Sequence, residues 1–214
     1  MTMTAEPDLT IVRRARIGDR ERLRRMQQRA FRILGRGDYT DAEISSFLSH
    51  LGTMDDFLLH EGTYYMVEID GCLAACGGWS RRTPLQGKSL RPPQAIDAAV
   101  VPWIRSIFVD PRFARQGLAT RLMELAEREA AFAGYRQLQL TASLNAVPLY
   151  EAFGYEATAR SAIDLPDGLR FRVVAMRKDV EAVTHPASRP DHRELFAMTF
   201  RPDRLVNPPG ASPS

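Results

Sequence analysis

The sequence predicts an α+β fold built around a mixed sheet, and three features of the chain point to it. Two antiparallel hairpins are indicated, one at Asp70-Gly71 and one around Pro166-Asp167-Gly168, because these residues favour the tight turns that join neighbouring strands. Between the hairpins, the segment 103–133 has the pattern of a buried strand, a loop and a helix, a unit that joins parallel strands. A chain of 214 residues with both kinds of unit favours one domain of ordinary size.

In the N-terminal part, two helices are expected to follow an opening strand. The expected elements are a strand over 9–16, helices over 19–34 and 40–51, and strands over 64–69 and 72–79. Asp19 is a candidate N-cap for the first helix. Thr40 caps the second, where Glu43 stands three residues on and completes a capping box.

In the C-terminal part, helices alternate with strands before the closing hairpin. The expected elements are a strand over 103–109, a helix over 120–133, a strand over 137–141, a helix from Pro148 to before Gly154, and strands over 155–165 and 169–178. The first of these strands is rich in β-branched and aromatic residues and is closed by Asp110-Pro111. The helix over 120–133 has one apolar face, and Gly134 is suited to the position after its end.

The domain is predicted to span residues 9–179, with residues 1–8 as an extension and 180–214 as a largely irregular, proline-containing tail. The extension lacks the basic and apolar regions of a secretory signal. Inside the domain, 80–102 is a long basic loop interrupted by prolines. Such a loop is either a solvated connection or a segment that faces the substrate.

Composition narrows the class of protein. Hydrophobic residues make up 44% and charged residues 26% of the chain, the balance of a soluble globular domain. The net charge of +3 is small and the basic residues are mostly scattered arginines, so nucleic acid is not an expected partner. No apolar run approaches the length that spans a bilayer, so a membrane is not expected either. Cys72 and Cys76 are expected to be reduced thiols on one strand face, as in a cytoplasmic protein, rather than a disulfide or part of a metal site. A monomer or a homodimer is expected, without a metal.

The loop Arg115-Gln116-Gly117-Leu118-Ala119 precedes a helix and follows a strand. Free N–H groups at a helix start, together with the helix dipole, attract phosphate. Gly117 allows a diphosphate to approach the main chain closely, and Arg112 and Arg115 add positive charge. An ordinary strand–helix turn is the alternative interpretation of this loop taken alone.

A second motif extends this interpretation. Asn145-Ala146-Val147-Pro148-Leu149-Tyr150-Glu151-Ala152-Phe153-Gly154-Tyr155 follows the next expected strand. Together with Ile107-Phe108-Val109-Asp110-Pro111 and the Gln116-Gly117-Leu118-Ala119 loop, it resembles the GNAT superfamily of acyl-CoA-dependent N-acetyltransferases over residues 9–179. The resemblance implies a mixed, mostly antiparallel sheet with helices on both faces. It also implies a splayed pair of parallel strands over 103–109 and 137–141, and acetyl-CoA as co-substrate.

The resemblance assigns roles to single residues. It implies that the main chain of Ile107, Phe108 and Val109 contacts the pantetheine and the thioester. It also implies that the diphosphate is bound by the main chain of the loop and helix start, that is Arg115, Gln116, Gly117, Leu118, Ala119 and Thr120. Asn145 matches a position that contacts the cofactor arm, and Tyr150 matches the general acid near the cofactor sulfur. Ala114 departs from the Gln or Arg common at the loop's opening, so Arg112 or Arg115 is expected to supply that charge.

The implied reaction needs a neutral amine, although a lysine-like amine has a pKa of about 10.4. A base or a water relay must therefore remove its proton. The strand 103–109 has no carboxylate. A water relay is the expected route, with Glu68 on a neighbouring strand as the alternative. Tyr150 is the candidate acid for the departing thiolate, and a tyrosine packed in the core is its alternative role.

The predicted function is therefore acetyl transfer from acetyl-CoA to a primary amine of a small-molecule or peptide acceptor. A non-catalytic acyl-CoA-binding module on the same fold is the main alternative, because fold alone does not determine function. A nucleotide-binding regulator is less favoured, since no ribose-binding acid or Mg²⁺ ligand pattern is present.

Overall fold

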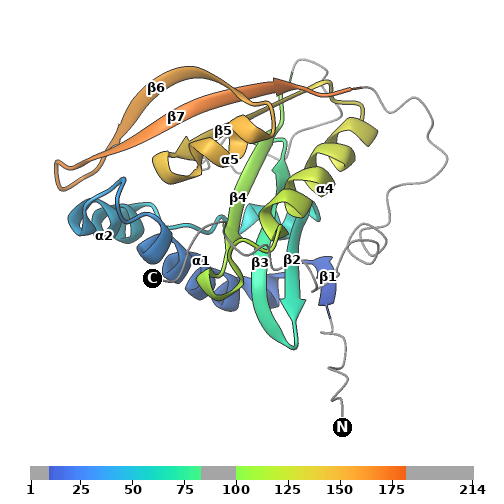
Figure 1. Ribbon diagram of the computed structural model, residues 1–214, viewed down its shortest axis with the longest axis horizontal. Coiled ribbons are helices and arrows are strands. Elements are labelled where there is room, and N and C mark those ends of the chain that lie inside the picture. The colour runs from blue at the N-terminus through green and yellow to red at the C-terminus, as the bar shows by residue number, and fades with distance from the viewer. Residues whose placement is uncertain (1–9, 83–99, 182–214) are drawn as a thin grey trace, which may run out of the picture.

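The computed structural model describes residues 10–82 and 100–181, in which seven strands form one sheet (Figure 1). The strands are β1 (Thr10–Arg14), β2 (Tyr64–Ile69), β3 (Cys72–Ser80), β4 (Trp103–Val109), β5 (Gln137–Ser143), β6 (Glu156–Asp164) and β7 (Arg170–Asp179). Their order across the sheet is β1-β2-β3-β4-β5-β7-β6. Only the β4–β5 pair is parallel. The predicted α+β fold with a mixed, mostly antiparallel sheet is therefore confirmed.

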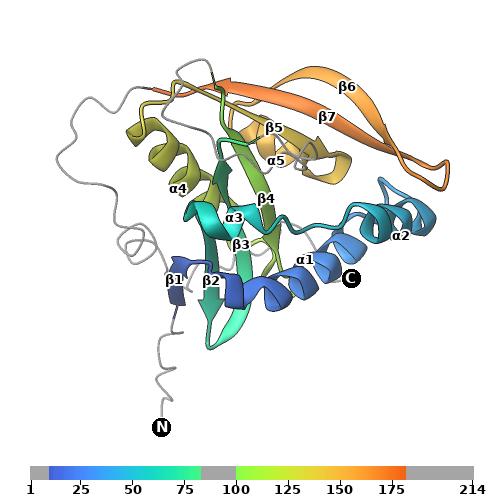
Figure 2. The same ribbon diagram turned by 180° about the vertical axis from the view of Figure 1, so that it is seen from behind.

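Helices cover both faces of this sheet, as Figures 1 and 2 show. The helices are α1 (Arg20–Leu34), α2 (Asp41–His50), α3 (Phe57–Glu61), α4 (Leu118–Phe132) and α5 (Val147–Ala152). On one face, α1 and α3 share a buried cluster with β2 and β3, and α1 and α2 share another with β7. On the other face, α4 and α5 pack together against β5 and β7. The central strand β4 is thus enclosed between two helical layers.

Helix α4 shows how the sequence pattern places an element. Leu118, Leu122 and Leu125 recur at helical spacing, and each is at most 1% exposed against β2 and β3. Burying each side chain contributes roughly 1.5–3 kcal/mol. The helix begins at Leu118, two residues earlier than expected from the sequence. The earlier start brings Leu118 into the apolar face and leaves Gly117 as the N-cap.

Of the two predicted caps, one forms and one does not. The Thr40 hydroxyl accepts the Glu43 N–H at 3.2 Å, and the Glu43 carboxylate accepts the Thr40 N–H at 2.7 Å. The predicted capping box of α2 is therefore confirmed. Asp19 precedes α1 but makes no side-chain cap. Its carboxylate instead accepts two 2.7 Å hydrogen bonds from the Arg13 guanidinium and one of 2.8 Å from the Arg16 N–H, so it is turned toward the segment that precedes α1.

The β2–β3 hairpin corrects the expected placement of the cysteines. Asp70 and Gly71 both have positive φ, 48° and 74°, as a two-residue turn of the predicted type requires. Further along, Val67 pairs with Ala75 but the adjacent Glu68 pairs with Leu73. This bulge reverses the alternation of β3, so the two thiols do not share a face. Cys76 is buried in the α1 cluster, whereas Cys72 is exposed, and both are free thiols.

One helix was not predicted from the sequence, and some predicted segments are not described by the structure. Helix α3 is absent from the predicted elements, because five residues are too short to show helical periodicity. Several predicted segments lie outside the described residues: the extension 1–8, the part of the basic loop that spans 83–99, and the tail from 182 to 214.

Candidate functional site

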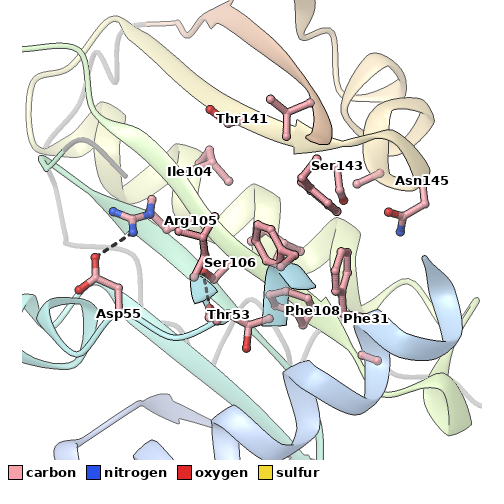
Figure 3. Close-up of a pocket in the computed structure, with 18 of the residues that line it drawn as sticks. Phe31, Thr53, Asp55, Ile104, Arg105, Ser106, Phe108, Thr141, Ser143 and Asn145 are labelled. Atoms are coloured by element: carbon pink, nitrogen blue, oxygen red, sulfur yellow. Dashed lines mark hydrogen bonds and ion pairs between the residues drawn. The ribbon is translucent and has the colours of Figure 1, made fainter. Parts of the chain in front are cut away.

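A cavity of about 570 Å³, called the central cavity below, lies where β4 and β5 separate (Figure 3). The two parallel strands are paired at a single position, Trp103 with Gln139. Strands that remain paired lie about 4.8 Å apart and leave no room between them. The loss of pairing beyond Trp103 therefore opens the sheet itself, which agrees with the splayed strand pair that the sequence resemblance implies.

The central cavity brings together residues from the two sequence motifs. Ile107, Phe108 and Val109 line it from β4, Asn145 lines it from the turn after β5, and Tyr150 lines it from α5. The side formed by residues 104–109 is called the β4 wall, and the opposite side is called the β5 wall (Thr141, Ser143, Asn145 and Tyr150). Figure 3 shows the labelled residues of both walls on opposite sides of the cavity.

The β4 wall contains a bulge. Arg105 pairs with Gly78 and Phe108 pairs with Cys76, so Ser106 and Ile107 together stand opposite one residue of β3. Ser106 has φ 50°, a left-handed conformation that is unusual for a residue other than glycine. A bulge interrupts the hydrogen-bond ladder and redirects main-chain groups, a feature often found beside active sites.

The predicted phosphate loop lies beyond the end of β4. Arg115 and Gly117 have φ 65° and 75°, and α4 begins directly afterwards. A Cβ on Gly117 would meet nothing within 4 Å, so the space in front of its main chain is open. Leu118 is buried in the core, so its side chain is not available to a ligand. Residues 115–120 do not line the central cavity. They follow, in the sequence, the β4 residues that do line it.

Asp110 anchors the connection between β4 and this loop. It is 1% exposed, and its carboxylate receives ion pairs from Arg29 and Arg112, the latter at 3.0 Å. Burial alone would raise the pKa of this carboxyl, but hydrogen bonds from Arg112 and Arg29 outweigh burial and lower the pKa to about 2. The Arg112 guanidinium therefore already has a partner, although 62% of its side chain is accessible.

On the β5 wall, Tyr150 and Asn145 carry the polar groups that the sequence resemblance assigns to the reaction. Tyr150 is 7% exposed, and burial raises the pKa of its hydroxyl above the ordinary tyrosine value. Asn145 has a buried Oδ1 that no group in the described part of the chain satisfies. The preceding turn is held by Tyr39, whose hydroxyl accepts the Leu144 N–H at 2.7 Å and donates to the Arg172 carbonyl at 2.6 Å.

Comparison with known proteins agrees with this geometry. The sequence profile described as the acetyltransferase (GNAT) family matches residues 21–155, which include both walls of the central cavity. The chain belongs to the GNAT acetyltransferase family. The predicted family is therefore confirmed, and with it the prediction that the chain is an acetyl-CoA-dependent N-acetyltransferase. No curated protein sequence matches this GNAT chain.

Solved structures share the fold at low sequence identity. A GCN5-related N-acetyltransferase from Rhodopseudomonas palustris aligns with TM-score 0.58 and 16% identity, covering 84% of this chain and 100% of that one. The PaiA N-acetyltransferase from Thermoplasma acidophilum, solved in complex with coenzyme A, aligns with TM-score 0.53 and 14% identity over 80% and 99% of the two chains. The ribosomal-protein-S18-alanine N-acetyltransferase from Escherichia coli aligns with TM-score 0.51 and 18% identity over 84% and 99%.

Several residues that line this GNAT cavity were not predicted from the sequence. Arg105 is 8% exposed on the β4 wall and pairs with Asp55 at 2.9 Å, as Figure 3 shows. Asp56 also lines the cavity and pairs with Arg20 at 2.8 Å. The segment that carries both aspartates has no motif and no periodicity, so nothing local marks it. A charged residue in the middle of the strand 103–109 was the one available signal, because a buried arginine requires an anionic partner.

Glu68, the alternative to a water relay as the base, is not part of the cavity. It pairs with Arg13 at 3.3 Å and with Arg22. Its role in this GNAT fold is therefore an ion pair between β1, α1 and β2. His50 lies at the rim of the cavity, whereas His60 is exposed on α3.

Other kinds of site were also sought. Within residues 10–82 and 100–181, no cluster of three or more His, Cys, Asp and Glu side chains is arranged to hold a metal ion. Among the same residues, no helix is long and apolar enough to cross a membrane.

Proposed function

We propose that this GNAT acetyltransferase transfers the acetyl group of acetyl-CoA to a primary amine by direct attack of the amine nitrogen on the thioester carbonyl carbon. The observation that carries the proposal is the meeting of Ile107, Asn145 and Tyr150, from two separate sequence motifs, around one cavity. A cavity of about 570 Å³ also has the size usual for small-molecule sites.

In this proposal, acetyl-CoA is held mainly by main-chain groups. The pantetheine and thioester lie along Ile107, Phe108 and Val109, where β4 has lost its pairing with β5. The diphosphate lies on the N–H groups of residues 115–120, at the N-terminus of α4. Asn145 is assigned to the cofactor arm, because its buried Oδ1 requires a donor. The coenzyme A complex of the Thermoplasma acidophilum relative supports the choice of cofactor.

Tyr150 is assigned the general acid. Attack of the amine on the carbonyl carbon forms a tetrahedral oxyanion, which main-chain N–H groups of the β4 wall stabilise. When the intermediate collapses, the C–S bond breaks and the CoA sulfur takes up the Tyr150 proton. The raised pKa of Tyr150 keeps this hydroxyl protonated through the neutral range, as an acid needs to be. The proton that the amine loses is assigned to a water relay, because Asp55 and Asp56 are each paired with an arginine.

The proposed acceptor is a primary amine on a small molecule or a peptide. It enters next to the segment that carries Asp55 and Asp56 and the rim of α1 and α2. The cytoplasmic location proposed from the sequence is compatible with two free thiols, Cys72 and Cys76.

The experiment that tests this function is an amine panel with acetyl-CoA as donor. Release of free thiol, together with the acetylated amine detected by mass spectrometry, is the expected result for at least one primary amine. Acetyl-CoA binding measured by calorimetry without thiol release for any amine would contradict the proposal.

Membership of an acetyltransferase family disfavours the alternative candidate, a non-catalytic acyl-CoA-binding module on the same fold. The binding module is favoured by one observation: β4 carries no carboxylate, and the two aspartates that line the cavity are both ion-paired. The same panel separates the two candidates, because a binding module gives calorimetric heat but no acetylated product.

A further inference from the structure

Behind the β4 wall lies a buried polar cluster that none of the roles above uses. Its members are Tyr64 on β2, Gln27 on α1 and Cys76 on β3, each 0% exposed. The Tyr64 hydroxyl donates to the main-chain carbonyl of Ser106 at 2.8 Å. Burying polar groups is costly unless they are bonded, so the hydroxyl and the carbonyl satisfy each other inside the core.

The hydroxyl reaches its partner across an intervening strand. Tyr64 pairs with Gly78 on β3, and β3 separates β2 from β4. At Gly78 the main chains of β2 and β3 approach each other too closely for a side chain. A Cβ on Gly78 would lie 2.1 Å from the Thr63 carbonyl oxygen and 2.8 Å from the Tyr64 Cα. The glycine is therefore required by the close approach of the β2 main chain at Thr63 and Tyr64.

Two further contacts hold the hydroxyl in place, one with the Gln27 amide and one with the Cys76 Sγ, which lies 3.2 Å from the Tyr64 oxygen. The Gln27 amide donates to the Tyr64 oxygen at 2.9 Å and lies 3.5 Å from the Cys76 Sγ. The Cys76 thiol is neutral, since burial raises its pKa to about 11. With the oxygen of Tyr64 accepting from Gln27, its own proton is available to the Ser106 carbonyl.

The bonded carbonyl belongs to the bulge. Ser106 is the residue with φ 50°, and its hydroxyl donates to the Thr53 carbonyl at 3.4 Å (Figure 3). The peptide between Ser106 and Ile107 is trans, so its C=O and N–H point in opposite directions. A carbonyl held toward Tyr64 turns the Ile107 N–H away from β3. The direction expected for the N–H is then toward β5, on the side where β4 has lost its pairing with that strand.

We propose that Tyr64 is a positioning residue, whose hydroxyl holds the Ser106–Ile107 peptide so that the Ile107 N–H is directed at the acetyl oxygen in the transition state. The proposal rests on the acetyl transfer proposed above. Tyr64 itself touches neither acetyl-CoA nor the amine; it acts through the orientation of one peptide plane. The main-chain donor is thereby fixed before the charge on the oxygen develops, which is how such donors lower a barrier.

The test compares Tyr64→Phe with the unaltered protein, using the best amine of the panel. Losing a whole oxyanion donor lowers kcat by about 10²–10³-fold, and a donor that is only misdirected should cost less. We expect kcat to fall about tenfold while the KM for acetyl-CoA changes less than about twofold. Tyr135→Phe is the control, since Tyr135 is also buried, in another cluster, and its hydroxyl has no partner among the described residues. It should leave kcat unchanged.

Two outcomes would overturn the proposal: an unchanged kcat in Tyr64→Phe, or equal losses of kcat in Tyr64→Phe and Tyr135→Phe. If Tyr64→Phe cannot be purified folded, Gln27→Leu removes the donor that orients the hydroxyl. About a threefold loss of kcat at unchanged KM then supports the proposal, and an unchanged kcat overturns it.

A second measurement separates this proposal from the proposed function. In NMR spectra of the unaltered protein, we expect acetyl-CoA to shift the amide resonance of Ile107. In Tyr64→Phe we expect this shift to be less than half of its size in the unaltered protein. The resonance reports the peptide's orientation without any turnover. An unaltered protein that acetylates no amine refutes the proposed function, whereas an equal Ile107 shift in both proteins refutes the role of Tyr64.

Discussion

The β4 wall and the β5 wall of the central cavity are braced in the same way but present different chemistry. Each is held by a buried tyrosine hydroxyl that bonds the main chain: Tyr64 bonds Ser106 on one side, and Tyr39 bonds Leu144 on the other. The β4 wall then offers peptide groups of a bulged strand, whereas the β5 wall offers side chains, Asn145 and Tyr150. Side-chain chemistry is visible in a sequence motif, but the direction of a peptide group is visible only in the fold.

The largest effect is expected on the β5 wall, from Tyr150→Phe. Loss of a general acid typically costs about 10²–10⁴-fold in rate. We expect kcat to fall at least about 10²-fold, with little change in the KM for acetyl-CoA, measured by thiol release at saturating substrates. Tyr155→Phe is the control, because its ring packs edge-on against Tyr150 at 6.0 Å but does not line the cavity. An undiminished kcat would remove Tyr150 from the mechanism.

Next in size is a disruption of the β4 wall through Gly78→Ala. The added Cβ would collide with main-chain atoms of Thr63 and Tyr64, and such overpacking costs about 1–3 kcal/mol. We expect the free energy of unfolding to fall by about 2–3 kcal/mol in urea denaturation, together with a lower kcat. Gly18→Ala should be neutral, because nothing lies within 4 Å of its Cβ and its φ is not positive. Equal stability of the two variants would show that β3 tolerates a side chain at Gly78.

The brace of the β5 wall can be tested by Tyr39→Phe. This change leaves the Leu144 N–H and the Arg172 carbonyl without their partner, and an unsatisfied buried group costs about 1–3 kcal/mol. We expect a loss of stability in that range by thermal unfolding. Because Asn145 follows this turn, the KM for acetyl-CoA should rise more than it does in Tyr64→Phe. The opposite ranking of the two KM values would refute the division between a cofactor-holding and an oxyanion-directing wall.

The smallest effect is expected in the loop that follows the β4 wall. Gly117→Ala places a side chain at φ 75° and in front of the proposed diphosphate, which costs about 1–2 kcal/mol of strain. We expect the KM for acetyl-CoA to rise about tenfold at unchanged kcat. Gly134→Ala, at φ 96° beyond the other end of α4, imposes a similar strain and also meets nothing within 4 Å. We expect Gly134→Ala to lower the stability of the protein as much as Gly117→Ala does, without changing the KM for acetyl-CoA. An equal rise in KM in both variants would show that the effect of Gly117→Ala comes from lost stability and not from cofactor binding.

Much of the fold could be read from local patterns. The Thr40–Glu43 box, the Asp70-Gly71 turn and the apolar face of α4 each involve residues close in sequence, so their physics is local. Where a distant partner competes, the local rule fails. Asp19 binds Arg13 and does not cap α1, and a bulge in β3 places Cys72 and Cys76 on different faces of the strand. The short helix α3 exists through its buried leucines rather than through its own periodicity.

By itself, the sequence determined the family, the α+β fold, and the residues whose side chains carry the proposed chemistry. These follow from motifs at the Gln116–Ala119 loop and at Asn145 and Tyr150, whose meaning depends on residue type and short spacing. Only the tertiary structure decided how β4 presents its main chain. The main chain of the bulge at Ser106 is bonded by a hydroxyl from β2, beyond the intervening strand β3, and a contact between such distant positions leaves no pattern in either segment.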